Sequence, residues 1–519
     1  MKVITFIVSF CLFSSSALAQ TSSGLLQPMT VLGNNTLTRG AARPIPIQTA
    51  SVGRSVKDYG AVCDGVTDDA SAIQSAINSN KWITFPVEGC VGAYVINTTV
   101  DVPAGRSLIG VVGAGGGVNG TAIKTTSSVT TLQISGSAVS ISGLSFTHSG
   151  AAGLIIRNLQ NDAIDIVNNS FWASAAGNTN PIIRTAGSTG WIRENRFTNQ
   201  RTDAFTIYID RSSGHISIEN HIELNYFGGV GKGILIASSD NSGRPEGVFI
   251  TNNTFINTNV NLYVEQILQL TVTSNVFDQG NSYQVHLKPS GPGIEGVQFT
   301  GNYFSTPNQP TNGISIYHDN ANPASPLTKV GIVNNMIAYT GYGIVLYSAA
   351  DAITINDNQF VSIGTNSIQA QNSKRVTITN NTMSASSTNN INLSDGSSGG
   401  PFIVDANQFD PSGAVTFTKT TPSKFKFGSE NTGKQLAGWS SLCTNSTSNP
   451  TGAYLNIPHG LAGTPDPSKI IVNLITNGLV VTPGPTLAVT GITSTYIYVQ
   501  VFYAQAVAGN YCVNAYASM

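Results

Sequence analysis

The stretch that decides the fold is GVFITNNTFINTNVNLYVEQILQLTVTSNVF, residues 247–277. It contains the triplet Asn-x-Phe twice. Ten times along the chain, at intervals of 22 to 33 residues, a short β-like run ends in this triplet, with Phe, Met or Ile in third place. The ten triplets begin at Asn169, Asn195, Asn225, Asn253, Asn275, Asn302, Asn335, Asn358, Asn381 and Asn407. A feature repeated at such a period is typical of a solenoid, in which each repeat is one structural unit.

The residues between the asparagines predict strands. Segments such as GVFITNNTF and AITINDNQF alternate apolar and polar residues, which is typical of strands with one buried face. No repeat contains a ten-residue amphipathic helix pattern, so helical repeats are excluded. Each repeat therefore predicts one coil of an all-β parallel β-helix, with coils about 4.8 Å apart.

The recurring Asn and the aromatic residue two places later both have a structural interpretation. Asn tolerates the left-handed backbone conformation, and its amide can bond the asparagines of adjacent coils. The aromatic residue is expected to stack inside the solenoid. The alternative for the asparagines is ligand binding.

The first 19 residues predict a secretory signal peptide. Lys2 supplies the positive charge, VITFIVSFCLF the apolar core, and Ala17-Leu18-Ala19 a small-residue cleavage site. The apolar run is too short to span a membrane, and no later segment resembles a span. We therefore expect a secreted protein, extracellular or periplasmic.

Four cysteines remain after the signal peptide: Cys63, Cys90, Cys443 and Cys512. An even number in an exported protein predicts disulfides, and four cysteines allow three connectivities. We favour Cys63–Cys90 and Cys443–Cys512, because each pair lies within one expected domain. Metal ligation is the alternative, but no CxxC motif or His partner lies nearby.

Composition excludes two classes of partner. Only 10% of the residues are charged and the formal net charge is −1. The chain therefore lacks the basic surface that nucleic acid or an anionic membrane requires. No cofactor is predicted, and no metal.

The segment SVKDYGAVCDGVTDDASAIQSAINSNKWITFP, residues 55–86, predicts a short helix followed by the first strand of the solenoid. Thr67 or Asp68 is expected to cap the helix, with Asp68 and Asp69 in its first turn. Ala72, Ile73, Ala76 and Ile77 form its apolar stripe. Such a helix would cover the open end of the β-helix, an edge that otherwise pairs with other chains.

The same segment resembles the amino-terminal motif of the pectate-lyase superfamily, which includes rhamnogalacturonase-, epimerase- and tailspike-like proteins. The resemblance rests on a set of matching positions: Asp58, Tyr59, Gly60, Ala61, Asp64, Gly65, Asp68, Asp69, Ala72 and Ile73. It implies a right-handed parallel β-helix and polysaccharide cleavage. It also implies that the aspartates of the motif are structural.

We expect five regions along the chain. They are a signal peptide (1–19), a flexible leader (20–51), the β-helix domain (52–410), a linker or edge strand (411–436) and a C-terminal β-sandwich (437–519). The sandwich is expected because short strands alternate with Gly and Pro turns there. NIPHGLAGTPDPSKIIV in this region resembles terminal domains of phage tail-fibre and tailspike proteins, which implies a carbohydrate-binding or trimerising module. A homotrimer is therefore conceivable, although no coiled-coil segment supports it.

Aligning the strand ahead of each Asn-x-Phe turn by its inward apolar residues gives two columns of outward residues. One column reads Arg157, Arg184, Asp210, Ala237, Glu265, Lys288, Tyr317 and Tyr347. The other reads Ile155, Ile182, Tyr208, Leu235, Tyr263, His286, Ser315 and Val345. Charged and aromatic residues are scarce in this chain, yet they gather on this face, and they are the residue types that bind sugars. The alternative is an ordinary polar solvent face.

This face predicts a glycoside hydrolase that acts on a long glycan. Asp210 and Glu265 lie two coils apart, about 10 Å along the solenoid, a spacing that suits an inverting mechanism once the side chains lean together. We assign Glu265 as the acid and Asp210 as the base, roles that could be exchanged. The substrate-binding candidates are Arg184, Tyr208, Tyr263, His286, Lys288, Tyr317, Asp319 and Tyr347. Further carboxylates held in reserve are Asp203, Asp240, Glu246, Glu219 and Glu223.

Two other functions stay open. A polysaccharide lyase would need a base and cations for a uronate, which Arg184, Lys288 and His286 or Tyr263 could supply. No tight Asp/Glu cluster predicts the calcium that many such lyases use. The chain lacks the paired-Asp and His-Gly signatures of polygalacturonase-type hydrolases, which argues against pectin as the substrate. A non-catalytic glycan-binding or adhesin-like protein would keep the fold without the chemistry.

Overall fold

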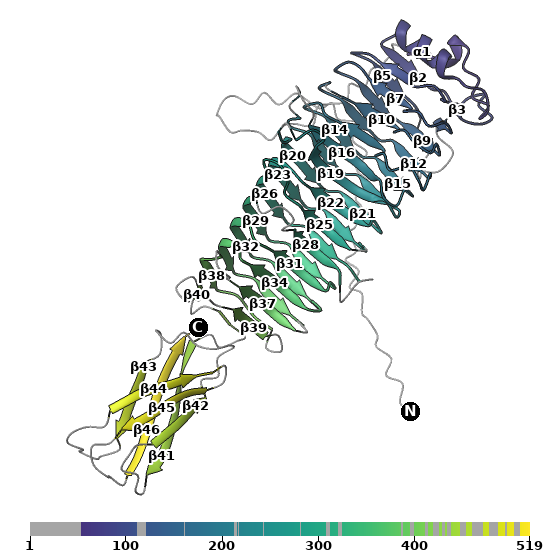
Figure 1. Ribbon diagram of the computed structural model, residues 1–519. Helices are drawn as coiled ribbons and strands as arrows, with labels where there is room; N and C mark the ends of the chain where they lie inside the picture. Colours follow the sequence, from purple (N-terminus) through teal and green to yellow (C-terminus); the bar gives the residue numbers. More distant parts are fainter. Residues whose placement is uncertain are drawn as a thin grey trace, which may run out of the picture. The chain divides into compact units, whose positions relative to one another are not determined.

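The protein is a parallel β-solenoid built from three long sheets (Figure 1). The computed structural model describes residues 53–432, except 112–120, 160, 212–214, 216, 242, 281, 308–311, 320–323, 386–387, 395–398, 411–413, 419–424 and 428–430; beyond residue 432 it describes 437–446, 453–458, 471–476, 486–493, 496–502 and 509–518. The expected all-β parallel β-helix is confirmed. The signal peptide and the leader lie outside the described residues.

Successive strands of the chain enter the three sheets in turn, so each coil adds one strand to each sheet. The 15-stranded sheet contains β1 (Arg54–Ser55), β2 (Trp82–Thr84), β5 (Ser107–Ile109), β8 (Ser140–Ser142), β11 (Asp165–Val167), β14 (Trp191–Arg193), β17 (His221–Glu223), β20 (Glu246–Thr251), β23 (Ile267–Thr273), β26 (Ile294–Thr300), β29 (Leu327–Val333), β32 (Ala350–Asn356), β35 (Lys374–Thr379), β38 (Phe402–Asp405) and β40 (Phe425–Phe427).

The other two sheets follow the same rule. The 13-stranded sheet contains β4 (Val100–Val102), β7 (Leu132–Ile134), β10 (Ile156–Asn158), β13 (Ile183–Thr185), β16 (Phe205–Arg211), β19 (Lys232–Ser238), β22 (Val260–Val264), β25 (Tyr283–Leu287), β28 (Ile314–His318), β31 (Tyr342–Leu346), β34 (Asn366–Gln371), β37 (Asn389–Ser394) and β39 (Ala414–Thr418). The 12-stranded sheet contains β3 (Tyr94–Val95), β6 (Thr121–Thr125), β9 (Leu144–His148), β12 (Ser170–Ala173), β15 (Arg196–Asn199), β18 (Tyr226–Gly228), β21 (Thr254–Ile256), β24 (Val276–Asp278), β27 (Tyr303–Ser305), β30 (Met336–Ala338), β33 (Gln359–Val361) and β36 (Thr382–Ser384).

The asparagine ladder is present and runs through the solenoid. In each rung the side-chain oxygen accepts from both the backbone N–H and the side-chain amide of the previous asparagine. Asn253, for example, donates to Asn275 Oδ1 from its backbone at 2.8 Å and from its side chain at 3.0 Å. The ladder continues past Asn407 to Asn431, one coil beyond the last Asn-x-Phe triplet.

The residue with the left-handed backbone conformation, however, is not the ladder asparagine. It is the residue one place earlier, such as Asn252 (φ 55°) before Asn253, or Ser274 (φ 57°) before Asn275. The expectation that the ladder asparagine itself takes this conformation is therefore wrong. The turn is made by the preceding residue, which leaves the ladder amide free to turn inward and bond its neighbours.

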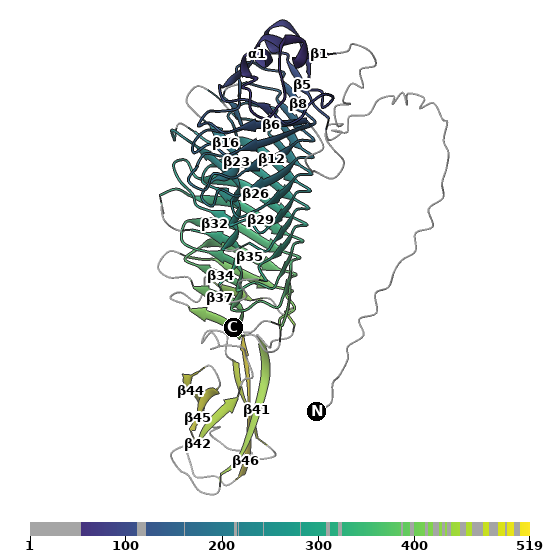
Figure 2. The same ribbon diagram turned by 90° about the vertical axis from the view of Figure 1, so that its right-hand side faces the viewer.

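The aromatic residues of the triplets form the expected internal stack. Phe227, Phe255, Phe277 and Phe304 lie ring on ring, with centroids 4.4 to 4.9 Å apart, and all four are fully buried. The coils lie above one another along the solenoid (Figure 2), and the strand register sets Phe227, Phe255 and Phe277 opposite one another. The repeated apolar residues thus form one continuous core.

A helix lies at the amino-terminal edge of the sheets. Helix α1 (Ala70–Ser79) buries Ile73 and Ile77, and Gln74 bonds the backbone N–H and C=O of Asp101 on edge strand β4 (2.7 and 3.0 Å). The helix starts after Asp69, not after Thr67 or Asp68 as expected. Asp69 is 2% exposed, and it accepts backbone hydrogen bonds from Val62, Cys63 and Val95. It therefore holds the loop structure together.

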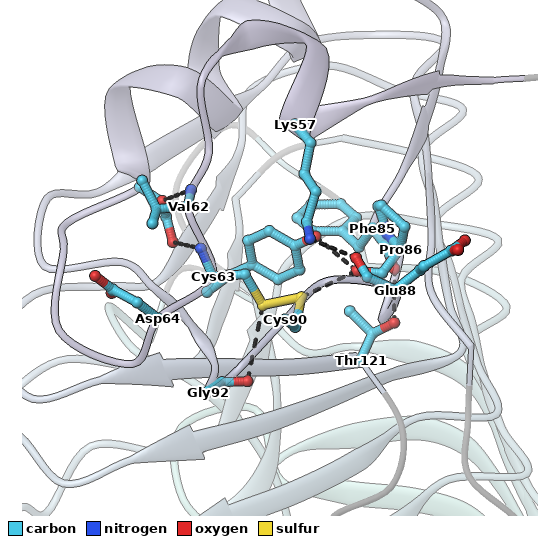
Figure 3. Close-up of a disulfide and its surroundings, with 12 residues drawn as sticks. Lys57, Val62, Cys63, Asp64, Phe85, Pro86, Glu88, Cys90, Gly92 and Thr121 are labelled. Atoms are coloured by element: carbon cyan, nitrogen blue, oxygen red, sulfur yellow. Dashed lines mark hydrogen bonds between the residues drawn. A yellow bond between two sulfur atoms is a disulfide. The ribbon is translucent and has the colours of Figure 1, made fainter.

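The expected Cys63–Cys90 disulfide is present, with its Cα atoms 5.1 Å apart. Figure 3 shows it beside Lys57, whose ammonium donates to the carbonyl of Glu88. The disulfide ties the loop before helix α1 to the loop after β2.

The region expected as a linker or edge strand contains two strands of the solenoid. Strand β39 pairs with β37 and strand β40 with β38, both parallel. The edge-strand alternative therefore describes this part of residues 411–436.

The C-terminal region contains two antiparallel three-stranded sheets. One has the order β41 (Ala437–Ser446), β46 (Gly509–Ser518), β43 (Ile471–Thr476), and the other β42 (Ala453–Pro458), β45 (Tyr496–Phe502), β44 (Thr486–Ile492). The pairing of β41 with β46 sets Cys443 opposite Cys512. That register suits the second expected disulfide, whose side chains lie outside the described residues, so the bond stays a prediction, as does the sandwich packing.

Among the described residues, no helix combines the length and the apolar character needed to cross a membrane.

Candidate functional site

The outward face of the 13-stranded sheet carries two adjacent columns of functional side chains. The first, here called the central column, is set by the strand pairing and reads Arg157, Arg184, Tyr208, Leu235, Tyr263, His286, Tyr317 and Val345. The second, the lateral column, lies two residues later and reads Asp210, Ala237, Glu265, Lys288, Asp319 and Tyr347. The central column runs from β10 to β31, and the lateral column from β16 to the end of β31.

This register differs from the sequence alignment at both ends. Arg184 pairs with Tyr208, not with Asp210, and Tyr317 pairs with His286, not with Lys288. The alignment there was wrong by two residues. The reason is a pair of consecutive buried residues near the start of each strand, such as Thr206 and Ile207. These residues interrupt the alternation of buried and exposed positions. Because that alternation repeats every two residues, a strand shifted by two residues along its neighbour shows the same pattern, and the sequence does not reveal the shift.

Asp210 is a fully buried carboxylate whose two oxygens accept four hydrogen bonds. Oδ2 accepts from Arg184 Nε at 3.0 Å, from Arg184 Nη2, and from the Ser239 hydroxyl at 3.1 Å, while Oδ1 accepts from the Ser239 backbone N–H at 2.9 Å. Arg184 in turn lies over the ring of Tyr208, 5.2 Å from its centroid. Burial, and then the charge of Asp210, raise the pKa of Tyr208. The phenol is therefore neutral.

Glu265 lies two coils from Asp210 in the lateral column, with Ala237 between them. Burial raises the pKa of Glu265 above its ordinary value, and this effect outweighs the opposing influence of Lys288 and of the hydrogen bond from Tyr263. Tyr263 is affected by both carboxylates: after burial, the charges of Glu265 and Asp319 raise its pKa. Tyr263 therefore lies within the electrostatic influence of both acids.

His286 and Asp319 form a second pair beside Glu265. His286 Nε2 lies 3.4 Å from Asp319 Oδ2, and the imidazole is only 9% exposed. Burial lowers the pKa of His286 to about 4, although Asp319 opposes the change. The imidazole is therefore neutral near pH 7 and can accept or donate a hydrogen bond.

Aromatic rings surround this cluster at varied angles. Tyr263 meets His286 edge-on (4.7 Å, 75°), and Tyr317 meets Tyr347 edge-on (6.0 Å, 86°). Tyr283 stacks on Tyr317 at 4.8 Å. Sequence analysis missed Tyr283, because it belongs to a third outward column that precedes the two consecutive buried residues.

A hollow of about 210 Å³ adjoins the Arg184 end of the face. It is lined by Leu154, Thr179, Asn180, Pro181, Arg184, Phe205, Tyr208 and Leu235. Only Arg184 and Tyr208 had been identified as site residues from the sequence. The remaining lining comes from Leu235 in the central column, and from turns and the third column, neither of which the repeat pattern marks as functional.

The reserve carboxylates divide between faces. Glu223 and Glu246 lie on strands of the 15-stranded sheet, and Glu219 precedes the first of these, so they do not join the site. Asp203 lies 3.8 Å from Lys232 at the strand start. In the described part of the chain, no group of three or more His, Cys, Asp or Glu side chains is arranged to hold a metal ion.

A parallel β-helix with a polar, aromatic-lined outer sheet defines the class of the protein. Residues 53–281 match the model of the family described as Rhamnogalacturonase A/epimerase, pectate lyase-like. Over these residues the chain is similar to the family that the amino-terminal motif implied.

Solved structures share the fold at low sequence identity. A tailspike protein mutant of E. coli bacteriophage HK620, in complex with a pentasaccharide, is 11% identical with a TM-score of 0.50, over 89% of this chain and 93% of that one. The Streptococcus pneumoniae surface protein and adhesin PfbA is 18% identical with a TM-score of 0.45, over 72% of this chain and all of that one. No curated protein matches the chain.

Proposed function

We propose that the protein binds a polysaccharide along the outward face of the 13-stranded sheet and hydrolyses it. The observation that carries the proposal is the cluster of Glu265, Tyr263, His286 and Asp319, in which Glu265 has a raised pKa and Asp319, beside His286, follows two coils later in the same column. A proton donor and a separate carboxylate are the two groups that glycoside hydrolysis needs. The family description, which names a rhamnogalacturonase, supports a carbohydrate as the ligand.

Glu265 is the proposed general acid. Its partial burial favours the protonated form, and a protonated carboxyl can donate to the oxygen of the leaving sugar. Lys288 follows in the same column and can stabilise the carboxylate that remains after the proton has left.

Asp319 is the proposed base that activates water. It lies two coils from Glu265, with Lys288 between them, a backbone separation of about 10 Å. This spacing suits an inverting reaction, in which a water molecule fits between sugar and base. Asp210 has the same spacing on the other side, but it is 0% exposed and its oxygens are occupied by Arg184 and Ser239. It is therefore better suited to holding Arg184 than to binding water.

The aromatic rings supply the binding surface for the glycan. Tyr263, Tyr283, Tyr317 and Tyr347 are distributed over consecutive coils, and successive coils lie about 4.8 Å apart, a spacing comparable to one sugar ring. A long chain can thus lie along the solenoid and contact several rings at once.

β-Elimination from a uronic-acid polymer is the second candidate. The neutral imidazole of His286, oriented by Asp319 and close to Lys288, could remove a proton beside a carboxylate that the lysine neutralises. The products separate the two reactions, because only elimination leaves an unsaturated uronate.

The test is turnover on a panel of bacterial and plant polysaccharides, followed by reducing ends and by ultraviolet absorbance together. Hydrolysis predicts new reducing ends without absorbance, and elimination predicts both. The variants are Glu265→Gln and Asp319→Asn, with Glu295→Gln and Asp351→Asn on the 15-stranded sheet as matched controls. Binding without either signal, across the panel, would replace the enzyme by a glycan-binding protein of the adhesin kind.

We also propose export, on the basis of residues 1–19, which cell fractionation of the full chain would check. Light scattering of the purified protein would decide between monomer and trimer.

A further inference from the structure

The hollow beside Arg184 is a preformed cavity on the outer face of the solenoid, and its lining residues lie one to four coils before Glu265. Its volume, about 210 Å³, lies below the range of about 300–1,000 Å³ for pockets that hold a drug-sized ligand. It therefore suits a single sugar ring. Phe205 and Tyr208 provide ring surfaces, and Leu154, Pro181 and Leu235 provide apolar walls.

One wall of the hollow is fixed by buried polar residues. Arg201, which is 0% exposed, donates from Nη1 to the carbonyl of Asn180 at 3.0 Å. Asn178, 1% exposed, accepts from the backbone N–H of Asn180 at 2.9 Å and donates to the carbonyls of Gly150 and Gly153. These bonds hold residues 178–181 in place before any ligand arrives, which lowers the entropy cost of binding.

Arg184 is held just as firmly. Its Nε and Nη2 both donate to one oxygen of Asp210, and the Asp210 side chain is itself held by Ser239. The guanidinium side chain remains 28% exposed and lines the hollow, so Nη1 keeps donors for a ligand.

The surroundings of the hollow contain further positive charge. Arg157 pairs with Arg184 on the preceding coil, and no ion-pair partner for it lies among the residues that the structure describes. Lys232 lies over the ring of Phe205, 5.4 Å from the centroid, with the exposed Asp203 at 3.8 Å. Arginine beside lysine and a second arginine favours an anionic group, because charge-assisted hydrogen bonds to a carboxylate are the strongest that Arg makes.

We infer that this hollow is a subsite for one acidic sugar unit of the bound glycan, whose carboxylate accepts hydrogen bonds from Arg184. Asp210 is then a positioning residue, which fixes the guanidinium without touching the sugar. The inference rests on the proposed function, since it places one unit of the same glycan on the same face. It adds the chemical class of that unit.

Two small probes test the subsite without requiring turnover. Methyl glucuronoside and methyl glucoside differ only in the carboxylate at C6, and calorimetric titration of the full chain compares their affinities. We expect the glucuronoside to bind about tenfold more tightly. Equal affinity for the two probes, or preference for the neutral one, would overturn the acidic subsite.

Two kinds of variant locate the binding. Leu235→Trp fills the hollow and leaves the Arg184–Asp210 pair intact, so it should abolish glucuronoside binding, while Val276→Trp on the outer face of the 12-stranded sheet should not. Arg184→Met leaves the buried Asp210 without its partner and is expected to lose stability. The double variant Arg184→Met/Asp210→Asn removes both charges and should fold while losing the preference for the glucuronoside. Unchanged binding in Leu235→Trp would contradict the assignment of the hollow.

The outcomes separate this inference from the proposed function. Turnover of neutral polysaccharides with no glucuronoside preference would remove the acidic subsite and keep the hydrolase. A glucuronoside preference that Leu235→Trp abolishes would support the subsite, even if no polysaccharide of the panel were cleaved.

Discussion

The outer faces of the 13-stranded and 15-stranded sheets carry similar residue types, but the environments of these side chains differ. On the 15-stranded sheet, hydrogen bonds from Lys329 and Arg244 lower the pKa of Glu295, and a hydrogen bond from Arg375 lowers that of Asp351. On the 13-stranded sheet, burial raises the pKa of Glu265 although Lys288 is near. Hydrogen-bonded partners of Glu295 and Asp351 on the first face favour their ionised forms, whereas burial of Glu265 on the second face favours its protonated form.

The aromatic residues show the same contrast. On the 15-stranded sheet, Trp191, His221 and Phe249 stack almost parallel, at 4.0 and 4.7 Å, so their faces cover one another. On the 13-stranded sheet one pair, Tyr283 and Tyr317, is stacked, but Tyr263 and Tyr347 meet their neighbours His286 and Tyr317 edge-on. Rings that are turned out of a stack keep a face for a sugar. The comparison teaches that side-chain environment, more than residue type, separates a site from a solvent surface.

The largest expected difference is in turnover. Glu265→Gln should lower kcat by about 10²-fold or more, the usual contribution of a general acid, because the amide cannot give up a proton. Glycan binding should change little. Glu295→Gln makes the same chemical change on the other sheet and should leave kcat within about twofold. Equal effects of the two variants, measured by initial rates at saturating substrate, would remove the distinction between the faces.

A large difference in stability is expected for the arginines. Arg184→Met leaves the buried carboxylate of Asp210 without its partner, and should reduce the free energy of unfolding by about 3–5 kcal/mol. Arg375→Met removes an exposed partner of Asp351 and should change stability little. Denaturant unfolding curves of both variants measure the difference. A stable Arg184→Met protein would mean that Asp210 is solvated.

A moderate difference is expected in glycan affinity. Tyr317→Ala should weaken binding of a cleaved polysaccharide, or of its oligosaccharides, by about 2- to 10-fold, through the loss of one aromatic contact. Phe249→Ala, in the stack on the 15-stranded sheet, should leave the affinity unchanged. Titration calorimetry measures the affinity of both variants. A loss of affinity in Phe249→Ala would mean that the glycan binds to the 15-stranded sheet and not to the 13-stranded sheet.

The smallest difference concerns pH. Because the pKa of Glu265 is raised in the folded protein, its protonated form favours folding, and this contribution is lost as pH rises through the folded-state pKa. Glu265→Gln should therefore have a higher Tm than the native protein near neutral pH, and the gap should shrink on acidification below the ordinary pKa of a glutamate. Glu295→Gln should show the opposite sign, since the pKa of Glu295 is lowered. Thermal unfolding across the acidic range checks both.

Sequence reasoning predicted a shared outward face, and the strand pairing agrees with that alignment in the middle of the face. It brought Glu265, His286, Lys288 and Tyr263 onto one surface, because apolar alternation within a strand shows which residues point outward. It missed Tyr283 and Phe205, which precede the consecutive buried residues, and the wall formed by residues 178–181. Their positions depend on turns whose length varies from coil to coil.

The sequence by itself determined the solenoid, the asparagine ladder and the phenylalanine stack, because each coil repeats the same local pattern and adjacent coils bring equal residues together. Only the tertiary structure decided that Arg184 pairs with Tyr208, that Asp210 is buried beneath it, and that His286 is neutral beside Asp319. The register of the strands and the burial and desolvation of their side chains depend on contacts between coils. A two-residue period leaves a shift of two undetermined, and distant turns decide which side chains water can reach.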